Sequence, residues 1–111
     1  MDFTGRKCVP CHAGTPRIDA ARARELAASL RGWQTDGAKL ERRFQFKDFA
    51  GAMRFVNAMA EVAERENHHP DFLVHGWNKV DVTLSTHAIG GLSENDFIMA
   101  SHIDRIPAGQ G

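Results

Sequence analysis

The stretch ERENHHPDFLVHGWNKVDVTLSTH, residues 64–87, contains two adjacent histidines and ends on another. His68 and His69 are followed by Pro70, and His87 closes the stretch. A histidine with an ordinary pKa of about 6.5 can both donate and accept protons at neutral pH, which few other side chains can do. Three imidazoles can instead hold a catalytic zinc ion with an open fourth position. The spacing alone leaves proton transfer and zinc binding as alternatives.

Glu64 lies close to this histidine cluster in the sequence, and three further histidines lie outside the cluster. Glu64 lies four residues before His68, within one helical turn, where it could hold one tautomer of the ring or favour its charged form. Crowded imidazoles also oppose one another's protonation. Isolated histidines are usually satisfied by backbone carbonyl groups, so we interpret His12, His75 and His102 as surface or structural residues.

A second chemical pattern lies near the N-terminus, where Cys8, Cys11 and His12 form the C-x-x-C-H sequence of a c-type haem attachment site. Such a haem requires export, and MDFTGRKCVPCHAGTP lacks the apolar region of a signal peptide. A four-ligand zinc site would need a second pair of ligands, and the chain has no third cysteine. A weak metal clip stays an alternative. We interpret residues 1–17 as an irregular N-terminal arm and residues 18–111 as a single domain.

The composition excludes several classes of function. A chain of 111 residues is long enough for one domain that buries a sizeable hydrophobic core. Its 14 basic and 14 acidic side chains cancel, which argues against a nucleic-acid binder. No apolar run approaches the roughly 18 residues that a membrane span requires. We therefore expect a cytoplasmic protein whose cysteines are reduced.

Local signals predict the first elements that must position the histidines. Asp19 is a suitable N-cap for the helix-forming run AARARELAASL, and Gly32 follows this run as a stop. Residues 33–35 look extended and are separated by the turn signal DG from residues 39–46, which we predict as a second strand. Arg42 interrupts the apolar alternation of that second strand.

The clearest periodicity lies between Asp48 and Pro70. Apolar residues recur there at helical steps and predict one buried face, made of Phe49, Ala52, Met53, Val56, Met59, Ala60 and Ala63. The helix should end just before Pro70, because a residue that precedes proline disfavours the helical conformation. The histidine pair would then lie at its C-terminal end. Phe55 and Val62 lie beside the predicted face, and we expect this extra apolar surface to serve a symmetric homo-oligomer.

Two further strands and a last helix follow. Residues 72–77 and 79–86 are predicted as strands, and the second alternates apolar with polar residues. Ser93 is predicted to cap the last helix, with Asp96 returning a hydrogen bond in a variant of the capping box. Strands joined by short turns pair antiparallel. We therefore expect an α+β fold with the order α-β-β-α-β-β-α, in which three helices pack on one face of a four-stranded antiparallel sheet.

The sequence resembles the signature of the pterin-4a-carbinolamine dehydratases. The stretches NKVDVTLSTH and GLSENDFIMAS are similar to the family, and the resemblance covers roughly residues 19–106. Animal members often have an aspartate at the position of Asn67, and one residue fewer before the aromatic position. The signature positions themselves are Glu64, His68, His69, Pro70, Trp77, His87 and Asp96.

The resemblance implies a dehydratase that needs no cofactor and no metal. The family removes water from the 4a-hydroxytetrahydropterin left by aromatic amino acid hydroxylases, and returns a quinonoid dihydropterin for reduction. By similarity, His68 and His87 form an acid/base pair and His69 positions the pterin. The resemblance also implies that the ring contacts Asn67, Ser85, Thr86 and Ala88, and that Glu64, Pro70, Trp77 and Asp96 support the imidazoles or shape the pocket.

The same resemblance provides an alternative, a protein-binding module. Animal relatives double as dimerisation cofactors for a homeodomain transcription factor, and related domains serve in assembly. A pure binding module would have no reason to keep all three histidines, so we favour the enzyme. The family forms dimers or tetramers. We therefore expect a homodimer or homotetramer with a reduced pterin as substrate, a functional link to an aromatic amino acid hydroxylase, and no nucleic-acid or membrane partner.

Overall fold

The elements follow one another in the order that the sequence predicts. The computed structural model describes residues 16–30 and 32–106. The expected α+β fold is confirmed. Its helices are α1 (Ala20–Ala28), α2 (Phe49–Glu66) and α3 (Glu94–Asp104), and a short 3-10 turn, η1, spans His87–Ile89. Its strands are β1 (Gln34–Thr35), β2 (Leu40–Gln45), β3 (Asp71–His75) and β4 (Lys79–Leu84).

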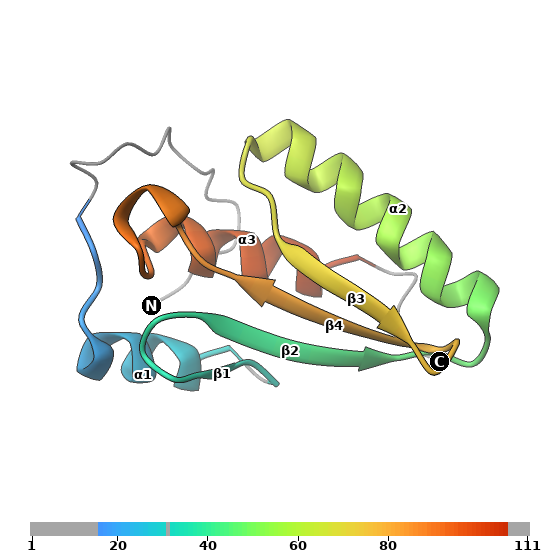
Figure 1. Cartoon of the computed structure of the whole chain (residues 1–111), viewed down its shortest axis with the longest axis horizontal. Coiled ribbons are helices and arrows are strands. Elements are labelled where there is room, and N and C mark those ends of the chain that lie inside the picture. Colours follow the sequence, from blue (N-terminus) through green and yellow to red (C-terminus); the bar gives the residue numbers. More distant parts are fainter. Residues whose placement is uncertain (1–15, 31, 107–111) are drawn as a thin grey trace.

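The four strands form one antiparallel sheet in the order β1-β2-β4-β3. Figure 1 shows α2 and α3 running beside the long strands and α1 lying next to β1. The side chains of β4 alternate, because successive residues of a strand point to opposite faces. Val80, Val82 and Leu84 are buried under the helices, whereas Asp81 and Thr83 are partly exposed on the other side, which we call the open face.

The buried face of α2 differs from the predicted stripe. Phe55 and Val62, expected beside the stripe, are buried in the core, whereas Phe49 is 53% exposed. The prediction is confirmed for Ala52, Val56, Met59 and Ala63, which are buried, and it is wrong for Phe49 and Ala60, which are exposed. The apolar residues of α2 cover more than one stripe, and only the sheet and α3 select which stripe is buried. Because Phe55 and Val62 lie in the core of one chain, they do not provide surface for an oligomer.

Arg42, which interrupts the apolar alternation of β2, is held by α3. Its guanidinium lies 2.8 Å from Asp104 Oδ1 and 4.4 Å from the ring centroid of Phe44. Trp33 Nε1 donates to both Asp104 oxygens, at 2.9 and 3.0 Å. Burial raises the pKa of Asp104 above its ordinary value of 3.8, while the donors Trp33 and Arg42 act to lower it. These contacts join the β1–β2 edge of the sheet to the end of α3.

Several boundaries differ from the predicted ones. Trp77, expected at the end of a strand, lies in the turn between β3 and β4 with a φ of 59° and a side chain that is 60% exposed. At the other end of the domain, Ile18 N donates to Leu92 O at 2.7 Å, which attaches the segment before α1 to the loop before α3.

Residues 1–15, including the C-x-x-C-H pattern, lie outside the described residues. Within residues 16–30 and 32–106, no helix is both long enough and apolar enough to cross a membrane.

Candidate functional site

The end of α2 separates the two adjacent histidines. Asn67 follows the helix with a φ of 53°, in the left-handed conformation that asparagine tolerates better than most residues. The chain then leaves the helix axis, and Pro70 prevents its continuation. As a result His68 is buried, whereas His69 is exposed. The sequence NHHP therefore places one imidazole beneath the surface and the other on it.

The histidines lie where β3 and β4 separate. The last pair of this ladder joins Asp71 to Thr83, and continuing the same register outward would set His69 opposite Ser85. The ladder stops here, so the two segments diverge and form the walls of a cleft of about 320 Å³. Small-molecule sites typically begin at about 300 Å³, so the cleft can hold one compact ligand. Its lining consists of Asn67, His68, His69, Pro70, Asp71, Ser85, Thr86 and Ala88.

His68, which lines this cleft, is paired with Asp96, which is buried behind it. His68 Nε2 lies 2.7 Å from Asp96 Oδ1, with His68 8% exposed and Asp96 fully buried. Asp96 lies in the first turn of α3, where the helix dipole favours negative charge. A carboxylate accepts hydrogen bonds and donates none, so it can hold an imidazole in one tautomer. This pairing joins the ends of two helices that are distant in the sequence.

The second carboxylate oxygen of Asp96 is also occupied. Thr86 Oγ1 donates to Asp96 Oδ2 at 2.8 Å, and the backbone N–H of Ser93 donates to the same oxygen at 3.0 Å. This second bond is the return bond predicted for the capping box. The hydroxyl groups of Thr86 and Ser93 lie 2.8 Å apart. Asp96 therefore belongs to a buried network that fixes the orientation of its carboxylate.

Glu64 contacts a different histidine from the one that the sequence suggested. Its Oε2 lies 3.4 Å from Nε2 of His69, and both side chains are largely exposed. His68 instead bonds to Asp96. The expectation that Glu64 holds His68 is wrong because the left-handed turn at Asn67 moves His68 off the helical face of Glu64. An exposed pair of this kind contributes little to stability.

The remaining candidate positions divide into two groups. His87 begins the turn η1 between Thr86 and Ala88, so its backbone lies at the cleft, but its side chain is outside the described part of the structure. Trp77 lies beyond the far end of β3, whose four residue steps span about 13 Å at roughly 3.3 Å each. The expectation that Trp77 shapes this cleft is therefore wrong for a single chain.

Two residues of the site were not predicted as such. Asp71 lines the cleft, and the signal for it was its position directly after the H-H-P sequence. Ser93 was recognised only as a helix cap, although its hydroxyl also contacts Thr86.

Among the side chains that the structure describes, no three histidine, cysteine, aspartate or glutamate residues are grouped so that they could hold a metal ion.

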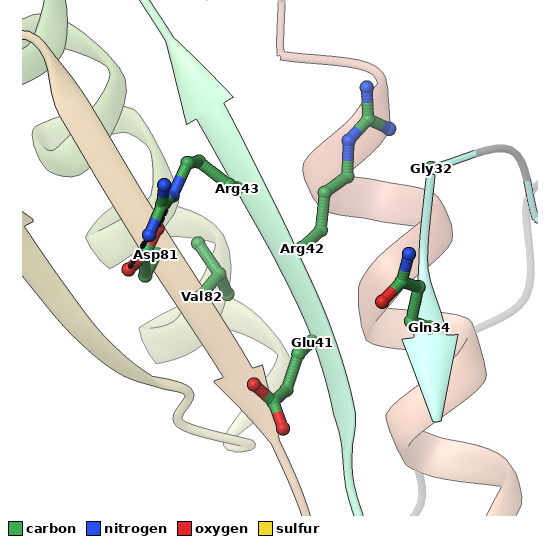
Figure 2. A pocket seen from close by; sticks show the side chains of 7 residues that line it. All are labelled: Gly32, Gln34, Glu41, Arg42, Arg43, Asp81 and Val82. Carbon is green, nitrogen blue, oxygen red and sulfur yellow. Dashed lines mark hydrogen bonds and ion pairs between the residues drawn. The ribbon is translucent and has the colours of Figure 1, made fainter. Parts of the chain in front are cut away.

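A second hollow, of about 350 Å³, lies on the open face of the sheet. Figure 2 shows that Arg43 and Asp81 point toward each other across β2 and β4. Their closest atoms, Arg43 Nε and Asp81 Oδ1, are 2.7 Å apart, and this bond lowers the pKa of Asp81 below 3.8. Asp81 Oδ2 also lies 2.9 Å from His75 Nε2. Because these charged groups already contact one another, the first cleft is the better candidate for chemistry.

The fold and the cleft define a small α+β protein with a ligand-sized site and a carboxylate-bound histidine suited to proton transfer. Comparison with known proteins identifies the family. The family model described as pterin 4 alpha carbinolamine dehydratase matches residues 16–106, a range that spans all the residues that the structure describes. The chain belongs to the pterin-4a-carbinolamine dehydratase family.

Relatives from bacteria and plants show the same affiliation. A protein of Nitrosomonas europaea that is assigned by name to the pterin-4-alpha-carbinolamine dehydratases is 48% identical over 106 residues, which cover 95% of this chain and 93% of the relative. Pterin-4-alpha-carbinolamine dehydratase 2, mitochondrial, of Arabidopsis thaliana is 41% identical over 110 residues, which cover 95% of this chain and 59% of that longer protein.

Two solved structures share the fold. The transcriptional coactivator/pterin dehydratase from Brucella melitensis is 38% identical, with a TM-score of 0.74 over 80% of this chain and 96% of that chain. A pterin dehydratase-like protein identified as a RuBisCO assembly factor in the alpha-carboxysome is 25% identical, with a TM-score of 0.57 over 70% of this chain and 89% of that chain. The fold therefore also occurs in proteins whose names describe a binding role.

Proposed function

We propose that this chain eliminates water from a 4a-hydroxytetrahydropterin and releases a quinonoid dihydropterin. The observation that carries the proposal is the 2.7 Å pair of His68, which lines a ligand-sized cleft, and buried Asp96. Membership of the pterin-4a-carbinolamine dehydratase family supplies the substrate class. Neither observation alone would identify this reaction, because a histidine–carboxylate pair serves many proton transfers.

The proposed reaction requires one proton donor and one proton acceptor. The C4a–O bond breaks, and its electron pair leaves with the hydroxyl group, which takes a proton from a general acid and departs as water. The N5–H bond then gives its proton to a base, and its electron pair forms the C4a=N5 double bond. We assign these two roles to His68 and His87. Each positioned group can contribute roughly 10²- to 10⁴-fold in rate.

The remaining lining residues are proposed to hold the planar pterin ring. His69 is exposed at the rim of the cleft, where it can contact the ring without being needed for the fold. Asn67, Ser85 and Ala88 line the walls, and their short side chains leave space for the ring. We propose that the reaction takes place in the cytoplasm, where it regenerates the pterin cofactor of an aromatic amino acid hydroxylase.

The test is an assay of purified protein on freshly generated 4a-hydroxytetrahydropterin. We expect the wild type to exceed the spontaneous rate, and the double variant His68→Ala/His87→Ala to lose at least about 10²-fold of that enhancement. Circular dichroism must show that the double variant is folded. Near wild-type dehydration by a folded double variant would reject the catalytic assignment.

A protein-binding role is the second candidate, and one comparison favours it. The structural relative described as a RuBisCO assembly factor shows that the fold can serve assembly. A binding protein would not accelerate dehydration, so the same assay separates the two roles. A wild-type protein that binds a pterin or another protein without exceeding the spontaneous rate would favour the binding role.

A further inference from the structure

Two buried hydroxyl groups lie next to the His68–Asp96 pair and have no role in the proposed reaction so far. Thr86 and Ser93 are each only 2% exposed, and their Oγ atoms are 2.8 Å apart. We infer that Thr86 and Ser93 are positioning residues, an inference that rests on the proposed function. They orient the Asp96 carboxylate, and this carboxylate in turn holds His68 with its proton on Nε2.

The directions of the hydrogen bonds follow from the donors available. Thr86 Oγ1 donates its one proton to Asp96 Oδ2 at 2.8 Å, so the contact between the two hydroxyl groups must use the proton of Ser93. The network therefore runs in one direction, from Ser93 to Thr86 to Asp96. Buried hydroxyl groups that are joined in this way order one another and the carboxylate that ends the chain.

The polar groups of Thr86 are used within the protein. Its backbone N–H donates to Gly91 O at 2.7 Å, and its carbonyl oxygen accepts from Ile89 N at 3.2 Å and from Gly91 N at 3.4 Å. Its hydroxyl proton goes to Asp96. Thr86 lines the cleft but has no donor left for a ring. It therefore acts through Asp96, whereas the family resemblance had implied a direct contact with the ring.

The consequence concerns the ring nitrogens of His68. Asp96 receives two bonds at Oδ2, from Thr86 and from the backbone of Ser93, and this leaves Oδ1 aimed at His68. Because a carboxylate only accepts, Nε2 of the neutral ring carries the proton. Nδ1 is then the nitrogen that exchanges a proton with the substrate. Without the hydroxyl of Thr86, the carboxylate can turn away from Nε2, which weakens the contact that selects this tautomer.

The first experiment reads the tautomer directly. The imidazole ¹⁵N spectrum of His68, assigned by its absence in His68→Gln, is recorded for the wild type, Thr86→Val, Thr86→Ser and Ser93→Ala. We expect one protonated Nε2 signal in the wild type and in Thr86→Ser, and a mixture of tautomers in Thr86→Val and Ser93→Ala. An unchanged Nε2 signal in both Thr86→Val and Ser93→Ala would overturn the inference. Ser93→Ala provides a second test if Thr86→Val does not fold.

The second experiment separates positioning from folding. We expect kcat for dehydration to fall about tenfold in Thr86→Val with KM nearly unchanged, because one hydrogen bond that supports the reacting group is lost. Thr86→Ser should restore the rate. Thr83→Val on the open face and Ser101→Ala within α3 are matched controls and should keep the wild-type rate. A raised KM with unchanged kcat would instead indicate a direct substrate contact and overturn the inference.

The two measurements also separate this inference from the proposed function. A wild type that shows no dehydration would reject the proposed reaction, while the ¹⁵N spectra would still test whether Thr86 and Ser93 orient His68. A wild type that is active, with a tautomer that does not respond to either variant, would reject only the positioning role.

Discussion

His68 and Asp96 are 28 positions apart in the chain, and their side chains meet at 2.7 Å beneath the cleft. The left-handed turn at Asn67 directs His68 inward from the end of α2, and the first turn of α3 directs Asp96 toward it. Both side chains are buried, so the pair is held by the packing of these two helix ends. Any loss of this pair should affect both the chemistry and the stability of the protein.

The first prediction concerns Asp96→Asn. The amide has nearly the same shape but can donate to Nε2, which would favour the other tautomer of His68. We expect kcat to fall by about 10²- to 10⁴-fold, as when the orienting aspartate of a Ser-His-Asp triad is replaced. Asp104→Asn, in the same helix but away from the cleft, is the matched control. Steady-state kinetics that give Asp96→Asn a wild-type kcat would contradict the prediction.

The second prediction separates the adjacent histidines by stability. His68→Ala removes the partner of a buried carboxylate oxygen and should lower the free energy of unfolding by about 1–3 kcal/mol. His69→Ala should leave this free energy nearly unchanged, because its contact with Glu64 is exposed. In the dehydration assay, His69→Ala should mainly raise KM for the pterin and change kcat less. Urea unfolding and steady-state kinetics measure both effects, and equal destabilisation of the two variants would contradict the assignment.

The third prediction concerns metal. If the imidazoles transfer protons, the purified protein should keep its full rate after dialysis against a chelator and should contain no stoichiometric metal. Elemental analysis and the dehydration assay test this together. About one zinc per chain, with activity that is lost on removal and restored on addition, would favour a metal-assisted mechanism.

The fourth prediction concerns two carboxylates whose pKa values shift in opposite directions. Hydrogen bonds from Arg43 lower the pKa of Asp81 below 3.8, so Asp81 stabilises the fold above that pH, and this contribution is lost as the pH falls through the lowered pKa. Burial raises the pKa of Asp104, so its contribution declines as the pH rises from 3.8 through the raised pKa.

Urea unfolding from about pH 3 to pH 7 should show these opposite trends. The stability advantage of the wild type over Asp81→Asn should shrink toward low pH. The free energy of unfolding of the wild type should instead fall relative to that of Asp104→Asn as the pH rises. Glu41→Gln, an exposed carboxylate on the open face, serves as the control. The same trend for both aspartate variants would contradict the assigned shifts.

The fifth prediction concerns self-association through β3. This strand lies at the edge of the sheet, and its side chains Phe72 and Leu73 are 47% and 59% exposed. An exposed apolar edge strand offers unpaired backbone groups to a second chain. We expect light scattering to find a homodimer or homotetramer at micromolar concentration, and Leu73→Lys to weaken it. Ala21→Lys on α1 is the control, and a monomeric wild type would contradict the prediction.

Local signals in the sequence determined the elements and the positions to which we assign the proposed chemistry. The N-caps Asp19 and Ser93 lie where the sequence predicted them, because a cap depends on residues within one turn. The end of α2 was recognisable from Pro70 for the same reason. The histidine pair and the family signature were readable because they depend only on residue type and on spacing along the chain, from Glu64 at the end of α2 to Asp96 at the start of α3.

The tertiary structure decided which side chains meet. The face of α2 that is buried, the contact of Glu64 with His69, and the distance of Trp77 from the cleft all differ from the sequence-based expectation. The buried face of α2 depends on its packing against the sheet and α3. The other two depend on the path of the chain at a turn, such as the left-handed residue Asn67, which moves His68 off the face of Glu64. The contact of His68 with Asp96 arises only when α2 and α3 pack at the end of the sheet, because no local rule relates positions that far apart.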